Sequence, residues 1–101
     1  MKFQEFESSL ENPNPPAGLS ALLDALWFEA CGFWRESDWK RAHQIVQDEV
    51  GAEACQVHAY LHRREGDLPN ARYWYGRAGV EPRVDELEAE WADLVRALLG
   101  S

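Results

Sequence analysis

The chain has 101 residues and a formal net charge of −8, with 18 acidic against 10 basic side chains. A chain of this length forms one domain and buries enough surface for a core without disulfides or metals. The 46% content of hydrophobic residues excludes a wholly disordered chain. The acidic balance argues against nucleic-acid and anionic-membrane partners, because both are bound through clusters of lysine and arginine.

The N-terminal sequence MKFQEFE has no apolar run typical of a secretory signal. No stretch approaches the roughly 18 apolar residues of a membrane-spanning helix. We therefore expect a cytoplasmic protein, in which Cys31 and Cys55 stay reduced and buried. Their spacing matches no zinc or redox motif.

Residues 1–18 are predicted to form an N-terminal tail, and residues 19–101 a single helical domain. The sequence NPNPP at residues 12–16 excludes a helix interior or a central strand, because proline lacks the backbone donor that both require. The part before it either docks as a short turn of helix or stays mobile. Its apolar side chains are Phe3, Phe6 and Leu10.

Five helices follow, each predicted from apolar side chains that recur every three or four residues. No segment alternates between apolar and polar residues, so the predicted fold class is all-α. The loops are short, and successive helices are therefore expected to be antiparallel neighbours. The predicted helices cover residues 19–36, 39–50, 52–65, 68–78 and 83–99.

Glycine, proline and aspartate mark the expected helix ends. Ser37 or Asp38 is predicted to cap the second helix. Gly66 is predicted to close the third helix and Asp67 to cap the fourth, with a proline in its first turn. Asp85, with a glutamate three residues later, has the spacing of a capping box for the last helix.

The third and fourth predicted helices resemble a tetratricopeptide hairpin. Small and aromatic residues recur at the spacing of that family, and a glycine–aspartate pair lies at the turn between the helices. The preceding pair of helices matches in part, with Val46 where the family has an aromatic residue. The resemblance implies two stacked antiparallel hairpins, closed by an amphipathic C-terminal capping helix. The matching residues are Ala59, Gly66, Asp67, Ala71, Tyr75, Ala78 and Pro82.

Residues 59–79 carry the pattern AYLHR-x-EGD-x-x-NA-x-YWY-x-RAG. This pattern is similar to that of a family of small, uncharacterised bacterial proteins. The resemblance implies a compact, all-helical, cytoplasmic protein and implies no catalytic mechanism.

A protein- or peptide-binding surface is predicted on the outer side of the third helix, since a tetratricopeptide-like packing implies that this side is concave. Arginine pairs there suit a carboxylate or another anion. The alternative is that the acidic segment 85–93 packs across Arg63 and Arg64, which would make them internal ion pairs. The predicted surface comprises Gln56, Tyr60, Arg63, Arg64 and Tyr73.

Three histidines form a second candidate site. His58 and His62 lie one turn apart on one helix, a spacing that can bring two imidazoles to one metal ion. His43 is a candidate third ligand, with Glu65 or Asp67 as the alternatives. Structural hydrogen bonding between helices is the alternative role. No cofactor is otherwise expected.

The sequence contains no nucleophile elbow, phosphate-binding loop or dinucleotide motif, so an enzyme is not predicted. The leading hypothesis is a non-catalytic module that binds a protein or peptide. The alternatives are a small-ligand or metal-binding protein that uses the histidines, and a homodimer that covers apolar flanks of the first or last helix. Trp74 and Tyr75 are predicted to face the core and Tyr73 the solvent.

Overall fold

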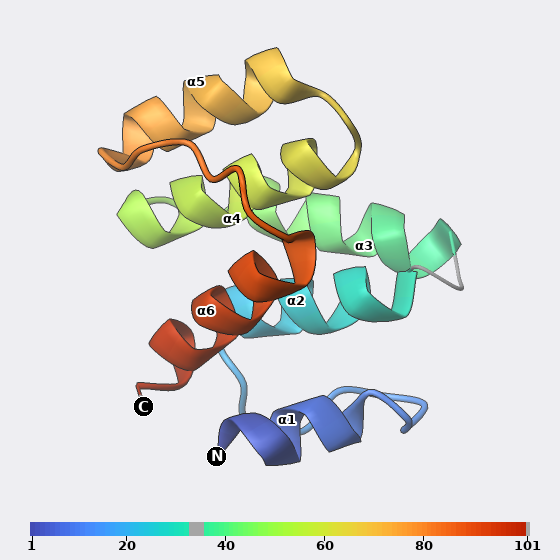
Figure 1. Ribbon diagram of the computed structural model, residues 1–101. Helices are drawn as coiled ribbons and strands as arrows, with labels where there is room; N and C mark the ends of the chain where they lie inside the picture. The colour runs from blue at the N-terminus through green and yellow to red at the C-terminus, as the bar shows by residue number, and fades with distance from the viewer. Residues whose placement is uncertain (33–35, 101) are drawn as a thin grey trace.

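The computed structural model describes residues 1–32 and 36–100, and this part of the chain is helical without a strand (Figure 1). The all-α prediction is confirmed. None of the described helices is long and apolar enough to cross a membrane. The helices are α1 (Phe3–Ser9), α2 (Ala21–Gly32), α3 (Glu36–Gln47), α4 (Ala52–Arg64), α5 (Leu68–Ala78) and α6 (Leu87–Leu99).

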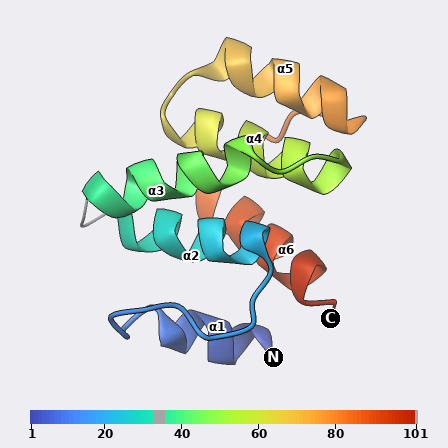
Figure 2. The same ribbon diagram turned by 180° about the vertical axis from the view of Figure 1, so that it is seen from behind.

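The helices stack from α5 at one end of the molecule, through α4 and α3, then α2 and α6, to α1 at the other end (Figures 1 and 2). Helix α2 packs along α3, and α4 packs along α5. Helix α6 lies against both α2 and α4, and α1 lies against α6. Both chain ends lie at the α1 end of the stack.

The predicted turn between α4 and α5 is confirmed. Gly66 has φ of +84°, a left-handed conformation that suits glycine because no Cβ is present. The Asp67 side chain caps α5 by accepting a hydrogen bond from the Asn70 amide at 3.4 Å, and Pro69 lies in the first turn. Gly79, with φ of +76°, ends α5 where the sequence predicts.

Helix α3 begins and ends about three residues earlier than predicted, so Ser37 and Asp38 lie within it and do not cap it. At its C-terminal end the amides of Asp48 and Glu49 bond to carbonyls three residues back, which tightens and closes the last turn. Val50, the last residue of the predicted helix 39–50, lies outside α3 and is exposed. The first helix was predicted to extend to residue 36, and α2 is described as far as Gly32. Residues 33–35, which include Trp34, lie outside the described residues.

Helix α6 begins at Leu87, four residues later than predicted, and Val84 is fully exposed outside it. The predicted capping box is wrong, because the Asp85 carboxylate binds the Arg83 guanidinium and its carbonyl accepts from Arg63. Glu86 is the residue that precedes the helix, and it makes no side-chain cap.

The N-terminal segment is docked, and α1 contributes to the main core. Phe6 is fully buried, and its ring centroid lies 5.9 Å from that of Trp91 in α6. The Trp27 indole of α2 donates to the Ser9 hydroxyl at 3.0 Å, and Trp91 donates to the Leu26 carbonyl at 3.1 Å. These bonds satisfy the two buried indoles and join α2 to both α1 and α6.

Both cysteines are buried, as predicted. The three consecutive aromatic residues of α5 are also placed as predicted: Tyr75 is buried, Trp74 packs against the small cluster that Tyr75 forms with two alanines, and Tyr73 is exposed.

Candidate functional site

The five residues of the predicted binding surface do not lie together on one exposed face. Tyr60 is only 1% exposed, because its ring packs in the core between α2 and α4. Arg63 and Arg64 both form ion pairs with buried glutamates. Gln56 is half-buried beside a second cavity, and only Tyr73 is well exposed. Arg63 therefore pairs with the acidic segment 85–93, as the alternative foresaw. Arg64 pairs instead with Glu29 of α2, which was not foreseen.

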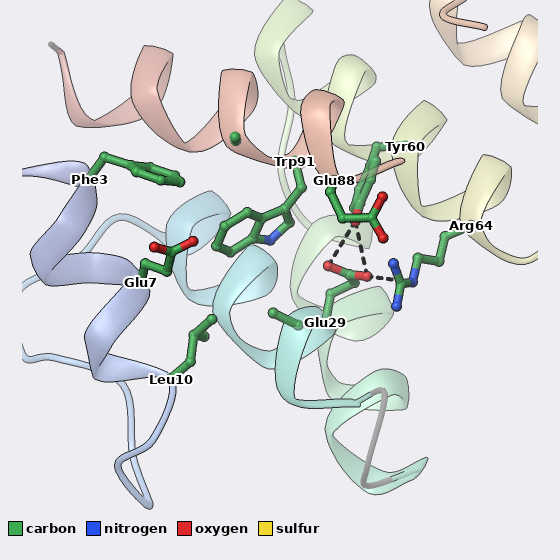
Figure 3. Close-up of a pocket in the computed structure, with 10 residues that line it drawn as sticks. Phe3, Glu7, Leu10, Glu29, Tyr60, Arg64, Glu88 and Trp91 are labelled. Carbon is green, nitrogen blue, oxygen red and sulfur yellow. Dashed lines mark hydrogen bonds and ion pairs between the residues drawn. The ribbon is translucent and has the colours of Figure 1, made fainter. Parts of the chain in front are cut away.

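Arg64 reaches α2, where it binds a glutamate that is almost fully buried. Its Nε lies 2.9 Å from Glu29 Oε1. The Tyr60 hydroxyl lies 3.2 Å from both oxygens of the same carboxylate and donates to it. We call these three side chains the Glu29 cluster; Figure 3 shows them meeting beneath α6.

Arg63, the preceding residue, points to α6 instead. Its Nη1 donates to Glu90 Oε1 at 2.8 Å, and the Tyr75 hydroxyl donates to the Glu90 carboxylate at 2.6 Å. We call Arg63, Tyr75 and Glu90 the Glu90 cluster. Two adjacent arginines thus bind α4 to α2 and to α6 through two clusters of the same composition.

A cavity of about 360 Å³ lies between α1, α2, α4 and α6 and contains the Glu29 cluster in its wall (Figure 3). This volume falls in the range of small-molecule sites. The wall combines apolar and aromatic side chains with three carboxylates and one guanidinium. Glu7 lies beside Phe3 on α1, whereas Glu29 and Glu88 lie on the side of Arg64 (Figure 3). The lining residues are Phe3, Glu7, Leu10, Glu29, Ala30, Tyr60, Arg64, Glu88, Trp91 and Ala92.

Burial dominates the electrostatics of this cavity. It raises the pKa of Glu29 to about 7, although Arg64 and the Tyr60 hydroxyl oppose the shift. Glu88 adds to the rise, because a second negative charge nearby disfavours ionisation. Burial also raises the pKa of Tyr60, which keeps its hydroxyl a donor. A carboxyl group that titrates near neutrality in a cavity is typical of functional sites.

The raised pKa of Glu29 makes a prediction about stability. The unfolded chain, with an ordinary pKa of 4.5, releases this proton before the folded chain does, at about 7. The contribution of Glu29 is therefore complete below pH 4.5 and is lost as pH rises through 7. Relative to a Glu29→Gln variant, the natural protein is expected to lose up to about 3 kcal/mol of stability over that interval. Urea unfolding of both proteins at several pH values measures it, and parallel curves would contradict it.

The three histidines do line one cavity, of about 250 Å³, between α3, α4 and α5. His43 bonds through its two ring nitrogens to the Trp39 carbonyl at 3.0 Å and to Glu65 Oε1 at 2.5 Å. His62 Nδ1 is 3.5 Å from the same oxygen but makes no hydrogen bond within the described structure.

His58 stacks on Trp74, with ring centroids 4.1 Å apart and an interplanar angle of 11°. Burial lowers the pKa of His58, and the nearby His62 and His43 lower it further, which favours the neutral ring against the indole. In the described part of the chain, no group of three side chains is arranged to hold a metal ion. The geometry therefore favours packing and hydrogen bonding for these histidines.

Glu29, Glu88 and Trp91 were not predicted from the sequence as residues of one site. A signal for Glu29 was present: it follows Leu22 and Leu26 at helical spacing, so it lies on the apolar face of α2. A carboxylate in such a position must be neutral or paired when buried.

Comparison of the chain with protein-family models, with curated proteins and with solved structures gives no match.

Proposed function

We propose that this protein is a non-catalytic binding protein and that its site is the cavity between α1, α2, α4 and α6. The observation that carries the proposal is the Glu29 cluster in the cavity wall. The cluster places a buried carboxyl group beside a space large enough for a small molecule or for one protruding side chain.

The cavity has the composition of a binding site. Phe3, Leu10 and Trp91 supply apolar contact area, and Tyr60 and Arg64 supply oriented polar groups. The four helices that meet there hold these groups on rigid elements, which lowers the entropy cost of binding.

Filling the cavity tests the proposal. Ala92 is half-buried in its wall, and an Ala92→Trp change places an indole in the space. Small aromatic compounds of different charge are added to the labelled protein, and amide chemical shifts are followed by NMR. We expect shifts at residues of the cavity in the natural protein and none in Ala92→Trp. Ala89→Trp, on the exposed side of α6, is the control that should still bind. Compounds that shift only residues elsewhere would refute the proposal.

A second candidate function follows from α5. Tyr73 is 55% exposed, and the Arg77 guanidinium donates to its hydroxyl at 3.2 Å. Residues 68–80 contain two arginines and no acidic residue, in a chain of net charge −8. This charge and the exposed aromatic ring suit an acidic segment of a partner protein. A tetratricopeptide-like arrangement of the hairpins α2–α3 and α4–α5 is part of this second proposal.

An acidic test peptide, such as a tetraglutamate with a terminal tryptophan, distinguishes the two candidates. Binding at α5 is expected to weaken in Tyr73→Ala and Arg77→Ala and to stay unchanged in Ala92→Trp. Sedimentation of the protein alone shows whether copies of the chain associate instead. A peptide affinity that neither α5 variant changes would refute this candidate.

A further inference from the structure

We infer that the cavity between α1, α2, α4 and α6 takes an organic cation: an ammonium group on a short apolar stem. The inference rests on the proposed function, because it names the chemical class of ligand for the same cavity. It follows from the charges, the aromatic wall and the pairing of the side chains that line the space.

The charges of the wall exclude an anion. Glu7, Glu29 and Glu88 outnumber the single guanidinium of Arg64. That guanidinium already binds Glu29 at 2.9 Å. Glu7 and Glu88 are exposed, and neither makes an ion pair within the described residues. Two carboxylates therefore remain to attract a positive group, and the net charge of −8 favours its approach.

The aromatic wall supplies the second part of the recognition. Figure 3 shows the Trp91 indole between the Glu7 and Glu29 sides of the cavity, with Phe3 beyond it. The Phe3 and Trp91 rings meet edge to face, with centroids 5.9 Å apart. Tryptophan is the aromatic residue that attracts cations best, and ammonium ligands are commonly held between aromatic rings and carboxylates.

Phe3 already interacts with one cation of the protein. The Arg96 guanidinium lies 4.2 Å from the centre of its ring. The Phe3 ring, which lines the cavity, thus already has the Arg96 cation over one of its faces. Trp91 has no such neighbour in the described structure, and the part of it that is exposed lines the cavity.

Glu29 links the ligand to the buried cluster. Burial holds its pKa near 7, so Arg64 does not fully stabilise its negative charge. A second cation in the cavity would favour the ionised form. The groups that act on Glu29 are Arg64 and Tyr60 of α4, His43 of α3 and Glu88 of α6.

Three probes of matched shape test the inference: benzylammonium, benzyl alcohol and benzoate. We expect benzylammonium to bind the natural protein at least about tenfold more tightly than benzyl alcohol. Benzoate is expected to bind most weakly. The dissociation constants are measured by NMR titration of the cavity amides.

Two glutamine variants show whether a specific carboxylate matters. Glu88→Gln removes a charge from the cavity wall, and Glu53→Gln removes one from an exposed position on α4 outside it. Only Glu88→Gln is expected to weaken the binding of benzylammonium, by about threefold or more. The affinity for benzyl alcohol is expected to stay unchanged. Equal effects of the two variants would overturn the inference, since only the net charge would then matter.

The outcomes separate this inference from the proposed function. If benzyl alcohol or benzoate binds as tightly as benzylammonium, the preference for a cation is refuted, but the cavity is still a binding site. Failure of all three probes to shift the cavity amides overturns both. The ammonium group can belong to a free amine or to a lysine side chain of a peptide. Comparing benzylammonium with acetyl-Gly-Lys-Gly-amide shows which source the cavity prefers.

Discussion

A Phe6→Ala change will lower the free energy of unfolding by about 3–5 kcal/mol. The Phe6 side chain is fully buried and packs against Trp91, so its removal leaves a void between α1 and α6. The seven residues of α1 cannot form a stable helix alone, and their packing depends on this ring. Urea unfolding followed by circular dichroism measures the loss.

Phe3→Ala is the matched control, because Phe3 lies in the same helix but is only half-buried. A smaller loss is expected there. Deletion of residues 1–18 should cost at least as much as Phe6→Ala. If the shortened chain unfolds at the same urea concentration as the whole chain, α1 is not part of the cooperative fold.

A Glu90→Ala change is expected to cost about 3–5 kcal/mol, because it leaves the largely buried Arg63 guanidinium without its carboxylate partner. The Arg63 side chain is 11% exposed and Glu90 is 3% exposed. The change also removes the acceptor of the buried Tyr75 hydroxyl. Thermal and urea unfolding measure the effect.

The control is Asp93→Ala on the same helix, since Asp93 pairs with Arg83 at 3.1 Å but is 60% exposed. An exposed pair of this kind contributes about 0–1 kcal/mol. The double variant Arg63→Met with Glu90→Leu should recover much of the loss, because neither buried charge remains. Equal losses for Glu90→Ala and Asp93→Ala would show that burial does not decide the strength of these pairs.

The helix ends were predictable where the residues of the turn itself determine the backbone conformation. Gly66, Asp67 and Pro69 each have one physical role at the α4–α5 turn, and the structure contains all three roles. The start of α6 was not predictable, because Asp85 has the spacing of a cap. Asp85 binds Arg63, which lies 22 residues earlier in the chain, and Arg83, which lies just before the helix. The helical spacing does not show either contact.

The candidate site was predictable only in part. Periodicity placed Tyr60, Arg63 and Arg64 on α4, but it did not show which neighbour each would face. Two adjacent arginines point about 100° apart on a helix, which allows them to reach different helices. The identity of their partners depends on how α2 and α6 cross α4, which no local pattern contains.

The position of α4 also has a consequence for the order in which the fold opens. Helix α4 contacts four other helices, whereas α5 packs in the described structure on α4 alone, with the Tyr75 hydroxyl as its bond to α6. Helix α5 can therefore separate once its packing on α4 and the Tyr75 bond are lost. Helix α4 is expected to separate last, because it contacts the most helices. Amide protons of α5 then exchange with solvent through partial opening, and those of α4 exchange only when the whole domain unfolds.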